Sequence, residues 1–493
     1  MQANQKFMAK IIKRLYPEVI TKTAARCRKR GLRIPTFKEL RHPELIPPSV
    51  RSRLKGVGLS DVNPVNLFRI TWKNDVQSGL YGGVNCLEIP PAISGVKARI
   101  IGLTGKFFPT GAHKVGAAFG CLVPRLVSGE FDPETHKAAW PSTGNYCRGG
   151  AFDCALLDCT AIAILPEGMS RERFDWLKEI GAQIIATPGC ESNVKEIYDK
   201  CWELKKDPLN IVFNQFEEFG NPIFHYNVTG PAFVEVLAGL GDARLRPAAY
   251  ISATGSAGTI AAGDFLKKQY PSLKIVATEA LQCPTLLING FGDHRIEGIG
   301  DKHVPWVHNV RNTDVVAAID DEDCLRSLRL FNEPAGKDYL ASLGADTRQI
   351  DKLAWLGISS ICNLLAAIKT AKYFELTEQD VILTVFTDST DLYQSRLREL
   401  RTERGAYGTN NAIADHAGPV AHQGIDYFKE LNYQERKALH NLKYYTWVEQ
   451  QGKTAQELTE QWNLEYWRAL FEDEVAYFDQ LIEEFNKQAG AVD

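Results

Sequence analysis

The feature that most constrains the fold is a repeated alternation of apolar runs and helical patterns between about residues 100 and 390. Short β-branched runs alternate with segments whose apolar residues recur every three or four positions, which is typical of parallel strands joined by crossover helices. We expect strands at residues 161–165, 183–187, 211–216, 248–253, 274–279 and 381–386, and helices after Ser170 and at residues 194–204 and 258–269. The pattern predicts an α/β protein with doubly wound parallel sheets.

A chain of 493 residues is too long for one compact core and predicts two domains with extensions. The predicted larger domain comprises residues 66–105 and 232–405, and the predicted smaller domain comprises residues 106–231. Residues 1–65 form an N-terminal extension that is locally basic and partly helical, and residues 406–493 form a helical C-terminal extension rich in aromatic side chains. We expect those aromatic residues to form the core of an appendage or a subunit contact.

Composition argues against several classes of protein. The net charge is −3, and no apolar run reaches the roughly 18 residues that would span a bilayer, so we expect no nucleic-acid or membrane partner. The first residues lack the apolar centre of a signal peptide, which predicts a cytoplasmic protein. Eleven cysteines contain no C-x-x-C pair, so we expect reduced thiols and no metal site.

A candidate nucleophile lies in the segment GKFFPTGAHKVGAAFG, residues 105–120. A Pro-Thr-Gly turn precedes Lys114, and the pattern that follows predicts that this lysine begins a helix. A lysine that is shielded from water at a helix N-terminus is disfavoured as a cation, so its amine could act as a nucleophile and base. Taken alone, the motif fits an exposed lysine after a turn at least as well.

A second segment, PSTGNYCRGG at residues 141–150, precedes a predicted helix. Its small residues free backbone N–H groups, which together with the helix dipole form a seat for an anion such as an α-carboxylate. Ser142, Thr143 and Asn145 add side-chain donors. The alternative is a capped turn without a ligand.

Two further segments lie at predicted strand ends. SATGSAGTIAAG, at residues 252–263, is a glycine-rich turn between a strand and a helix, a geometry that directs several N–H groups at a phosphate. Its glycine spacing matches neither the dinucleotide-binding fingerprint nor the P-loop. TVFTDSTDLY, at residues 384–393, places Ser389 just past a strand, where ligands bind in open α/β sheets, although a helix cap would explain it as well.

In this order and at these separations, the four segments resemble the fold type II pyridoxal phosphate enzymes, which include cysteine synthase, cystathionine β-synthase and the tryptophan synthase β subunit. The resemblance extends over residues 66–400, and PTGAHK is most similar to the tryptophan synthase β subunit. It also includes EGMSRERFDWLKEIGAQIIATPG at 167–189, FNQFEEFGNPIFHYNVTGP at 213–231, IEGIGDKHVP at 296–305 and GISSICNLLAAIK at 357–369. It implies pyridoxal 5′-phosphate as cofactor, bound by the larger domain, and a homodimer.

The resemblance also implies roles by position. Lys114 would carry the cofactor covalently and move the α-proton, Asn145 would contact the cofactor's 3′ oxygen, and Ser389 would meet the pyridine nitrogen. A neutral hydroxyl there, unlike a carboxylate, does not favour protonation of the ring. The unprotonated ring is a weaker electron sink, which favours reactions at the β-carbon over transamination. The phosphate would be held by Thr254, Gly255, Ser256, Ala257, Gly258 and Thr259. The substrate would contact Ser142, Thr143, Gly144, Asn145, Tyr146 and Arg148.

The implied activity is cysteine synthase-like β-replacement on an activated serine through an aminoacrylate. One alternative is a β-elimination lyase, of the desulfhydrase or ammonia-lyase type, that gives an oxo acid and ammonia. Two others are a non-catalytic relative that binds a partner through its extensions and a nicotinamide-binding enzyme.

The chain departs from the family pattern at two places beside the expected site. Tyr146 stands where the family commonly has threonine, and Arg148 could pair with a second anionic group on the substrate, or could face solvent or cap a neighbouring loop. Asp301, Lys302 and His303 replace the usual small or aromatic residues and could bear on the second substrate. Residues 333–353 are expected to be an insertion.

Overall fold

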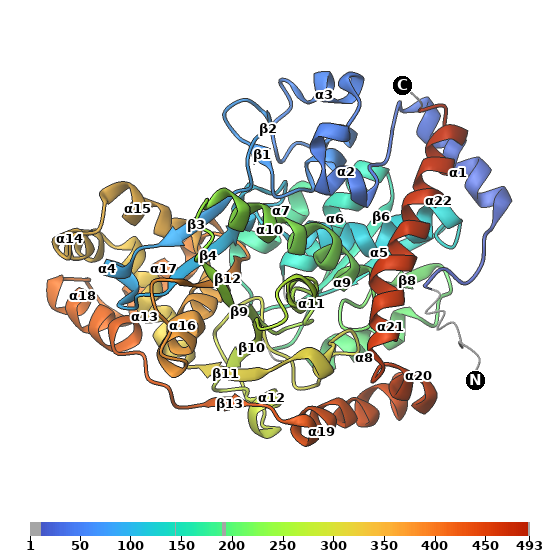
Figure 1. The fold of residues 1–493 in the computed structure, drawn as a ribbon. Coiled ribbons are helices and arrows are strands. Elements are labelled where there is room, and N and C mark those ends of the chain that lie inside the picture. Colours follow the sequence, from blue (N-terminus) through green and yellow to red (C-terminus); the bar gives the residue numbers. More distant parts are fainter. Residues whose placement is uncertain (1–10, 143, 190–193, 492–493) are drawn as a thin grey trace.

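The protein is described by a computed structural model that covers residues 11–142, 144–189 and 194–491 (Figure 1). Within these residues, one sheet has seven strands in the order β13-β11-β10-β9-β12-β4-β3, and another has four in the order β7-β6-β5-β8. The larger sheet contains β3 (Cys86–Ile89), β4 (Arg99–Thr104), β9 (Arg246–Ala253), β10 (Lys274–Ala280), β11 (Val315–Ile319), β12 (Asp380–Phe386) and β13 (Phe428–Glu430). The smaller sheet contains β5 (Lys137–Pro141), β6 (Thr160–Pro166), β7 (Gln183–Thr187) and β8 (Asn210–Val212).

The strand directions confirm the expected α/β class. The smaller sheet is wholly parallel. The larger sheet is parallel except at its edges, where β3 runs antiparallel to β4 and β13 runs antiparallel to β11. Parallel neighbours need crossover connections, and the helices between the strands supply them.

Both faces of the larger sheet are covered by helices. Tyr250 of β9 lies in the core that contains Ile260 of α11 (Ile260–Gln269), whereas the next residue, Ile251, lies in the core that contains Ile361 of α16 (Ile358–Tyr373). Successive side chains of a strand point to opposite faces. Strands buried on both faces have continuous apolar sequences, which explains why the central strands were recognisable as runs.

The helices of the smaller sheet begin close to the expected positions. They are α5 (Lys114–Ser128), α6 (Asn145–Leu157), α7 (Arg171–Glu179) and α8 (Val194–Leu204). Ser170 precedes α7 as expected, but its hydroxyl makes no cap and instead accepts a hydrogen bond from Arg173 Nη1 at 3.1 Å. β8 ends at residue 212, short of the expected residue 216, because Asn214 Oδ1 accepts from the Phe216 N–H at 3.1 Å and turns the chain.

The two extensions pack against each other and against α5. The N-terminal extension contains α1 (Pro17–Lys29), α2 (Phe37–Arg41) and α3 (Pro48–Leu54), and the long helix α22 (Glu474–Gln488) lies beside α1 in Figure 1. The Phe37 ring lies 5.7 Å from the Phe119 ring of α5 and 6.2 Å from the Phe478 ring of α22, between centroids. Residues from both ends of the chain thus support the helix that begins at Lys114.

The C-terminal extension also contributes an edge strand to the larger sheet. β13 pairs with β11 through Phe428, Lys429 and Glu430. A three-residue strand is too short to show a period of two, which is why the sequence pattern indicated helices alone. The remaining helices of this extension include α18 (Thr409–His416), α19 (Tyr433–Lys443), α20 (Ala455–Glu460) and α21 (Leu464–Arg468).

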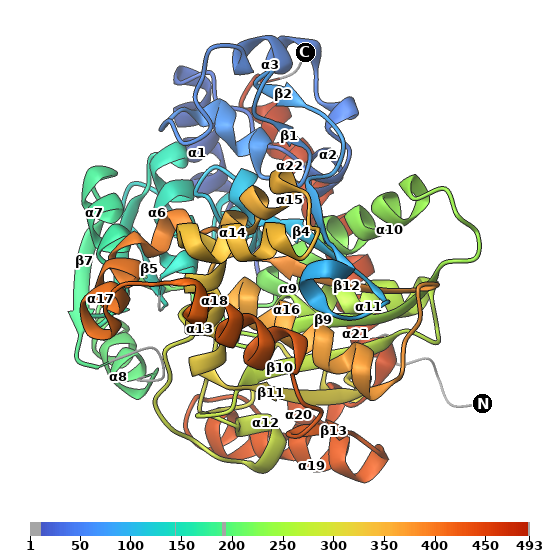
Figure 2. The ribbon, with the colours of Figure 1, turned by 90° about the vertical axis from the view of Figure 1, so that its left-hand side faces the viewer.

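Residues 333–353 contain two short helices that pack beside the helices of the larger sheet. These are α14 (Pro334–Ser342) and α15 (Thr347–Lys352), and Figure 2 shows α14 beside α13 (Asp321–Asn332) and α18. Leu340 and Ile350 anchor them in the core beneath α16.

No single helix in the described part of the chain is long and apolar enough to cross a membrane, and only the pair 347–355 and 358–373, bent by 120°, meets that criterion by length and composition.

Lys443 fastens the C-terminal extension to the segment that follows β10. Its buried ammonium group donates to the carbonyl oxygens of Trp306 at 2.9 Å and His308 at 2.7 Å, and to Gln461 Oε1 at 2.9 Å. We expect Lys443→Met to lower the free energy of unfolding by about 2–4 kcal/mol, because several buried acceptors lose their donor.

Denaturant unfolding followed by tryptophan fluorescence measures this loss. Lys437→Met on the same helix is the control, because Lys437 only lies over the Trp462 ring and should cost less than about 1 kcal/mol. Equal losses in the two variants would contradict a specific role for Lys443.

Candidate active site

Lys114 is the first residue of α5, as the sequence predicts, and its amine faces the glycine-rich turn. Nζ donates to Ser256 Oγ at 3.1 Å and to Gln215 Oε1 at 3.3 Å. Burial lowers the pKa of Lys114 from 10.5 to about 8. A sizeable fraction of the amine is therefore neutral, and nucleophilic, near physiological pH.

A glycine explains how Lys114 can be enclosed. A Cβ on Gly149 of α6 would lie 2.8 Å from the Val115 nitrogen and 3.0 Å from the Lys114 carbonyl carbon. Only a residue without a side chain lets α6 lie directly against the first turn of α5. The small residues of the 141–150 segment thus allow α6 to pack closely against α5, whether or not the segment also binds an anion.

The turn at residues 254–259 connects β9 to α11 and has the form of an anion cradle. Ser256 Oγ, which accepts from Lys114, also accepts from Asn221 Nδ2 at 3.0 Å. Ala257 has a φ of +60°, and a Cβ on Gly258 would lie 2.0 Å from Asn221 Oδ1. The chain is therefore held in a tight conformation at the N-terminus of a ten-residue helix, where backbone N–H groups favour a phosphate.

The hydroxyls of this turn are tied to the sheet. Thr254 Oγ1 donates to the Thr278 carbonyl oxygen at 3.0 Å, and Thr259 Oγ1 shares a hydrogen bond with Ser252 Oγ at 2.7 Å. Gly255 lies against the backbone of Ile299, since a Cβ there would be 3.3 Å from the Ile299 Cα. These contacts hold the turn against the sheet, and an anion cradle beside an amine of lowered pKa fits pyridoxal phosphate.

Asn145 begins α6 and contacts an aspartate that sequence reasoning did not single out. Its Nδ2 donates to Asp388 Oδ2 at 2.6 Å, and its buried Oδ1 has no hydrogen-bond partner among the described residues. An amide nitrogen carries two hydrogens, so one donor is left for a ligand.

Ser389 lies past the end of β12 as expected, but its hydroxyl donates to Asp391 Oδ2 at 3.0 Å. Its contact with a pyridine nitrogen stays a prediction.

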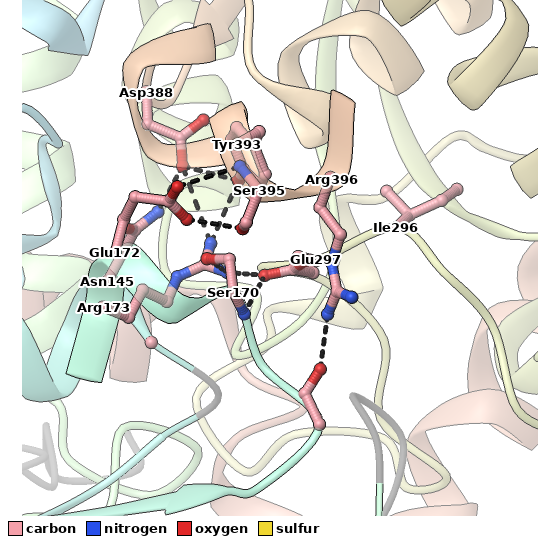
Figure 3. A network of polar contacts seen from close by, with 12 residues as sticks. Asn145, Ser170, Glu172, Arg173, Ile296, Glu297, Asp388, Tyr393, Ser395 and Arg396 are labelled. Carbon is pink, nitrogen blue, oxygen red and sulfur yellow. Dashed lines mark hydrogen bonds and ion pairs between the residues drawn. The ribbon is translucent and has the colours of Figure 1, made fainter. Parts of the chain in front are cut away.

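Asp388 belongs to a buried polar network between the two sheets (Figure 3). Its Oδ2 also accepts from Tyr393 OH at 2.8 Å and lies 4.0 Å from Arg173 Nη2. Arg173 comes from α7 of the smaller sheet and forms a buried ion pair with Glu297, which follows β10 of the larger sheet. Burial raises the pKa of Asp388, while Arg173 and the hydrogen bonds from Asn145 and Tyr393 oppose that rise.

Two more contacts reinforce the same junction. Glu172 accepts from the Ser395 backbone N–H at 2.9 Å and from its hydroxyl at 2.6 Å, and Arg396 Nε donates to Glu297 Oε1 at 2.6 Å. Gly144, with a φ of +151°, packs against Arg173, since a Cβ there would lie 2.3 Å from Arg173 Nε. The network therefore positions the 141–150 segment relative to the larger sheet.

The other predicted substrate residues have different surroundings. Ser142 Oγ accepts from the Gly144 N–H at 3.1 Å, and Thr143 lies outside the described residues. Tyr146 is buried with its ring 5.4 Å from the Trp140 ring, so it packs into the core of the smaller sheet. Cys147 is also buried, and burial raises the pKa of its thiol to about 12, which makes it a poor nucleophile.

Arg148 is buried and does not face solvent. Its Nη2 donates to the Thr110 carbonyl oxygen at 3.0 Å, and its guanidinium carbon lies 4.6 Å from the centre of the Trp176 ring. It therefore caps the turn before Lys114. Within the described residues its Nε and Nη1 have no hydrogen-bond partner, and burial, with nearby Arg173, lowers its pKa to about 10. Pairing with an anionic substrate stays a prediction.

Several residues beside Lys114 were not assigned individually from the sequence. Gln215 and Asn221 lie in the 213–231 segment that carried the family resemblance, but amides give no chemical signal on their own. His113 is stacked on Trp72 with centroids 5.8 Å apart, and burial lowers its pKa to about 3, so it is neutral. No cluster of three or more potential metal ligands occurs in the described ranges.

Comparison with known proteins shows the family of the chain. A family model described as pyridoxal-phosphate dependent enzyme matches residues 106–388. A cysteine synthase of Staphylococcus aureus is 31% identical over 256 residues, which cover 52% of this chain and 74% of that protein. A cystathionine beta-synthase of Saccharomyces cerevisiae is 28% identical over 320 residues, which cover 63% of this chain and 59% of that protein.

Solved structures show the same fold. The crystal structure of a cysteine synthase from Entamoeba histolytica superposes with a TM-score of 0.56 at 21% identity, covering 68% of this chain and 93% of that one. A hydrogen sulfide-producing enzyme from Fusobacterium nucleatum gives a TM-score of 0.53 at 24% identity, covering 62% and 95%. At these identities the likeness extends to the fold alone.

The packing of Gly258 predicts the effect of adding one methyl group. Gly258→Ala should weaken binding of pyridoxal phosphate at least about 10-fold, because the new Cβ would overlap Asn221 and displace the turn. Absorbance titration of the apoprotein measures the Kd. Gly239→Ala, where a Cβ meets nothing within 4 Å, should leave the Kd unchanged, and an unchanged Kd for Gly258→Ala would argue against a phosphate site at this turn.

The lowered pKa of Lys114 predicts a pH dependence for cofactor attachment. The neutral amine is the reactive form, so the rate of covalent uptake by the apoprotein should rise with pH through a midpoint near 8. Borohydride trapping followed by peptide mass spectrometry gives the rate at Lys114. A midpoint near the ordinary lysine value of 10.5 would show that the amine is exposed to water.

Proposed function

Because the chain belongs to the pyridoxal-phosphate dependent enzyme family, we propose that it catalyses β-replacement on an activated serine, with Lys114 as the cofactor-binding and proton-transferring residue. One observation carries the proposal: a lysine amine with a pKa of about 8 lies 3.1 Å from Ser256 in an anion-binding turn. The nearby amide of Asn145 and the backbone of residues 254–259 would hold the 3′ oxygen and the phosphate.

The protein's own groups fit the successive tasks of this reaction. Pyridoxal phosphate, when bound, supplies an electron sink that stabilises negative charge at the substrate α-carbon. Lys114 would remove the α-proton of the substrate, and its lowered pKa suits that role at neutral pH. The start of α6 at Asn145 would seat the α-carboxylate. Ser389 would leave the pyridine nitrogen unprotonated if it turned from Asp391.

The relatives support a reaction at the β-carbon. The Staphylococcus aureus and Campylobacter jejuni relatives are cysteine synthases, the latter 30% identical over 289 residues, and cysteine synthases form a bond at that carbon. Structures of hydrogen sulfide-producing enzymes share the fold and keep β-elimination as the second candidate. Elimination differs from replacement only in whether a nucleophile is added before the product leaves.

The remaining proposals concern location and assembly. We propose a cytoplasmic enzyme, supported by the free thiols of the ten cysteines in the described ranges, which suit a reducing compartment. We also propose a homodimer, which the family resemblance supports. Sedimentation of the purified holoenzyme tests the second point.

A substrate panel tests the main proposal. We expect the holoenzyme to convert O-acetylserine or O-phosphoserine plus sulfide to cysteine, with little pyruvate, and Lys114→Ala to lose both the visible absorption band and the activity. A preference for O-phosphoserine that Arg148→Met abolishes would assign Arg148 to an anionic leaving group. Pyruvate as the main product in the presence of sulfide would favour elimination, and a colourless protein that cannot be reconstituted would refute both.

A further inference from the structure

Asp301 and His303 form a carboxylate–imidazole pair where the family pattern has small or aromatic residues. Asp301 Oδ1 lies 3.0 Å from His303 Nδ1 and accepts from the His303 backbone N–H at 3.2 Å. A carboxylate at Nδ1 keeps the proton on that nitrogen, so the lone pair of a neutral ring is on Nε2. No side chain or carbonyl in the described ranges occupies Nε2, and the imidazole side chain is 27% exposed.

The pair is fixed to the turn that lies beside Lys114. The Gly300 N–H donates to the Thr254 carbonyl oxygen at 2.9 Å, and Thr285 Oγ1 donates to the Asp301 carbonyl oxygen at 2.7 Å. Thr254 opens the turn whose Ser256 contacts Lys114. The pair thus lies at the edge of the same site, and the Tyr198 ring of α8 faces His303 from the smaller sheet at 5.9 Å.

A small cavity joins the pair to the turn. It has a volume of about 10 Å³ and is lined by Thr254, Gly255, Glu279, Cys283, Thr285, Leu286, Gly300, Asp301, His303 and Pro305. That volume is about what one water molecule needs. Hydrogen sulfide is slightly larger than water and therefore needs only a small widening of this cavity beside His303, whereas a thiol with an amino-acid backbone requires the whole loop to move.

The charged groups around His303 suit it to accept a proton near neutral pH. Burial lowers the pKa of His303, but the charge and hydrogen bond of Asp301 outweigh it and raise the pKa overall, while neighbouring Lys302 opposes that rise. Tyr198 is neutral because burial raises its pKa well above 10. Burial also raises the pKa of Glu279 to about 8, so this second carboxyl is largely uncharged near pH 7.

We propose that His303, positioned by Asp301, is the catalytic base for the second substrate, and that this substrate is a small sulfur nucleophile such as hydrogen sulfide. The inference deepens the proposed β-replacement and rests on it. The S–H bond breaks, its proton passes to His303 Nε2, and the sulfur electron pair forms the new bond to the β-carbon, which has already lost its leaving group. The electron pair of the α–β double bond moves to the α-carbon, which takes back the proton that Lys114 had removed. The partly exposed imidazolium then returns the proton to water.

The test separates the two halves of the reaction in the holoenzyme. The His303→Gln and Asp301→Asn variants should react with O-acetylserine alone at the wild-type rate. The change in visible absorbance measures this rate. With sulfide, His303→Gln should lower kcat/KM for sulfide about 100-fold and remove the acidic limb of its pH profile. Asp301→Asn should move that limb to lower pH, because the pKa of His303 is no longer raised. The ionisation of sulfide is common to all variants, so differences between profiles report on the pair.

The surface pair His42 and Glu44 supplies a matched control. It has the same two-residue spacing and a 2.9 Å contact between His42 Nδ1 and Glu44 Oε1, but it lies in the N-terminal extension. His42→Gln should change neither half of the reaction.

Each outcome bears on a different claim. The role of His303 as a base would be overturned if His303→Gln left the acidic limb and the kcat/KM for sulfide unchanged. It would also be overturned if this variant slowed the reactions with O-acetylserine and with sulfide equally. Larger thiols that react as fast as sulfide would overturn the size restriction. If the wild-type holoenzyme does not react with O-acetylserine, the proposed β-replacement activity is refuted, and with it the basis for assigning a role to the Asp301–His303 pair.

Discussion

Arg173 lies buried between the two sheets, and its guanidinium group joins Glu297 and Asp388 on the larger sheet to α7 on the smaller one. Breaking a buried ion pair leaves a charge without compensation and costs about 3–5 kcal/mol. The relative position of the sheets is therefore strongly specified. Since Asn145 contacts Asp388 and Gly144 packs on Arg173, the same interaction also places the residues at the start of α6.

Two buried lysines show how the surroundings of an ammonium group decide its use. Lys443 donates hydrogen bonds to two carbonyl oxygens and an amide oxygen, and these bonds connect the C-terminal extension to the rest of the fold. Lys114 has one hydroxyl and one amide oxygen as partners, and burial lowers its pKa to about 8. Burial lowers the pKa of both amines. What distinguishes Lys114 is its place beside the turn at residues 254–259, where a neutral amine can react with a bound cofactor.

The extensions take part in the fold around the site. Phe37 and Phe478 from opposite ends of the chain pack at Phe119 of α5, and Lys443 holds the segment that follows residue 303. The helix that begins at Lys114 and the loop that carries Asp301 and His303 are thus each supported from outside the two sheets.

Periodicity and turn chemistry are local, so they predict the α/β class, most strands of the two sheets, the position of Lys114 at a helix start and the glycine-rich turn at residues 254–259. They could not place Arg173 against Asp388, since residues 215 positions apart meet only when the sheets pack. For the same reason the sequence does not decide whether Arg148 faces solvent, a loop or a ligand, and the three residues of β13 give no strand signal. Tertiary structure decided which polar groups face each other, because a buried charge is defined by the partners that enclose it.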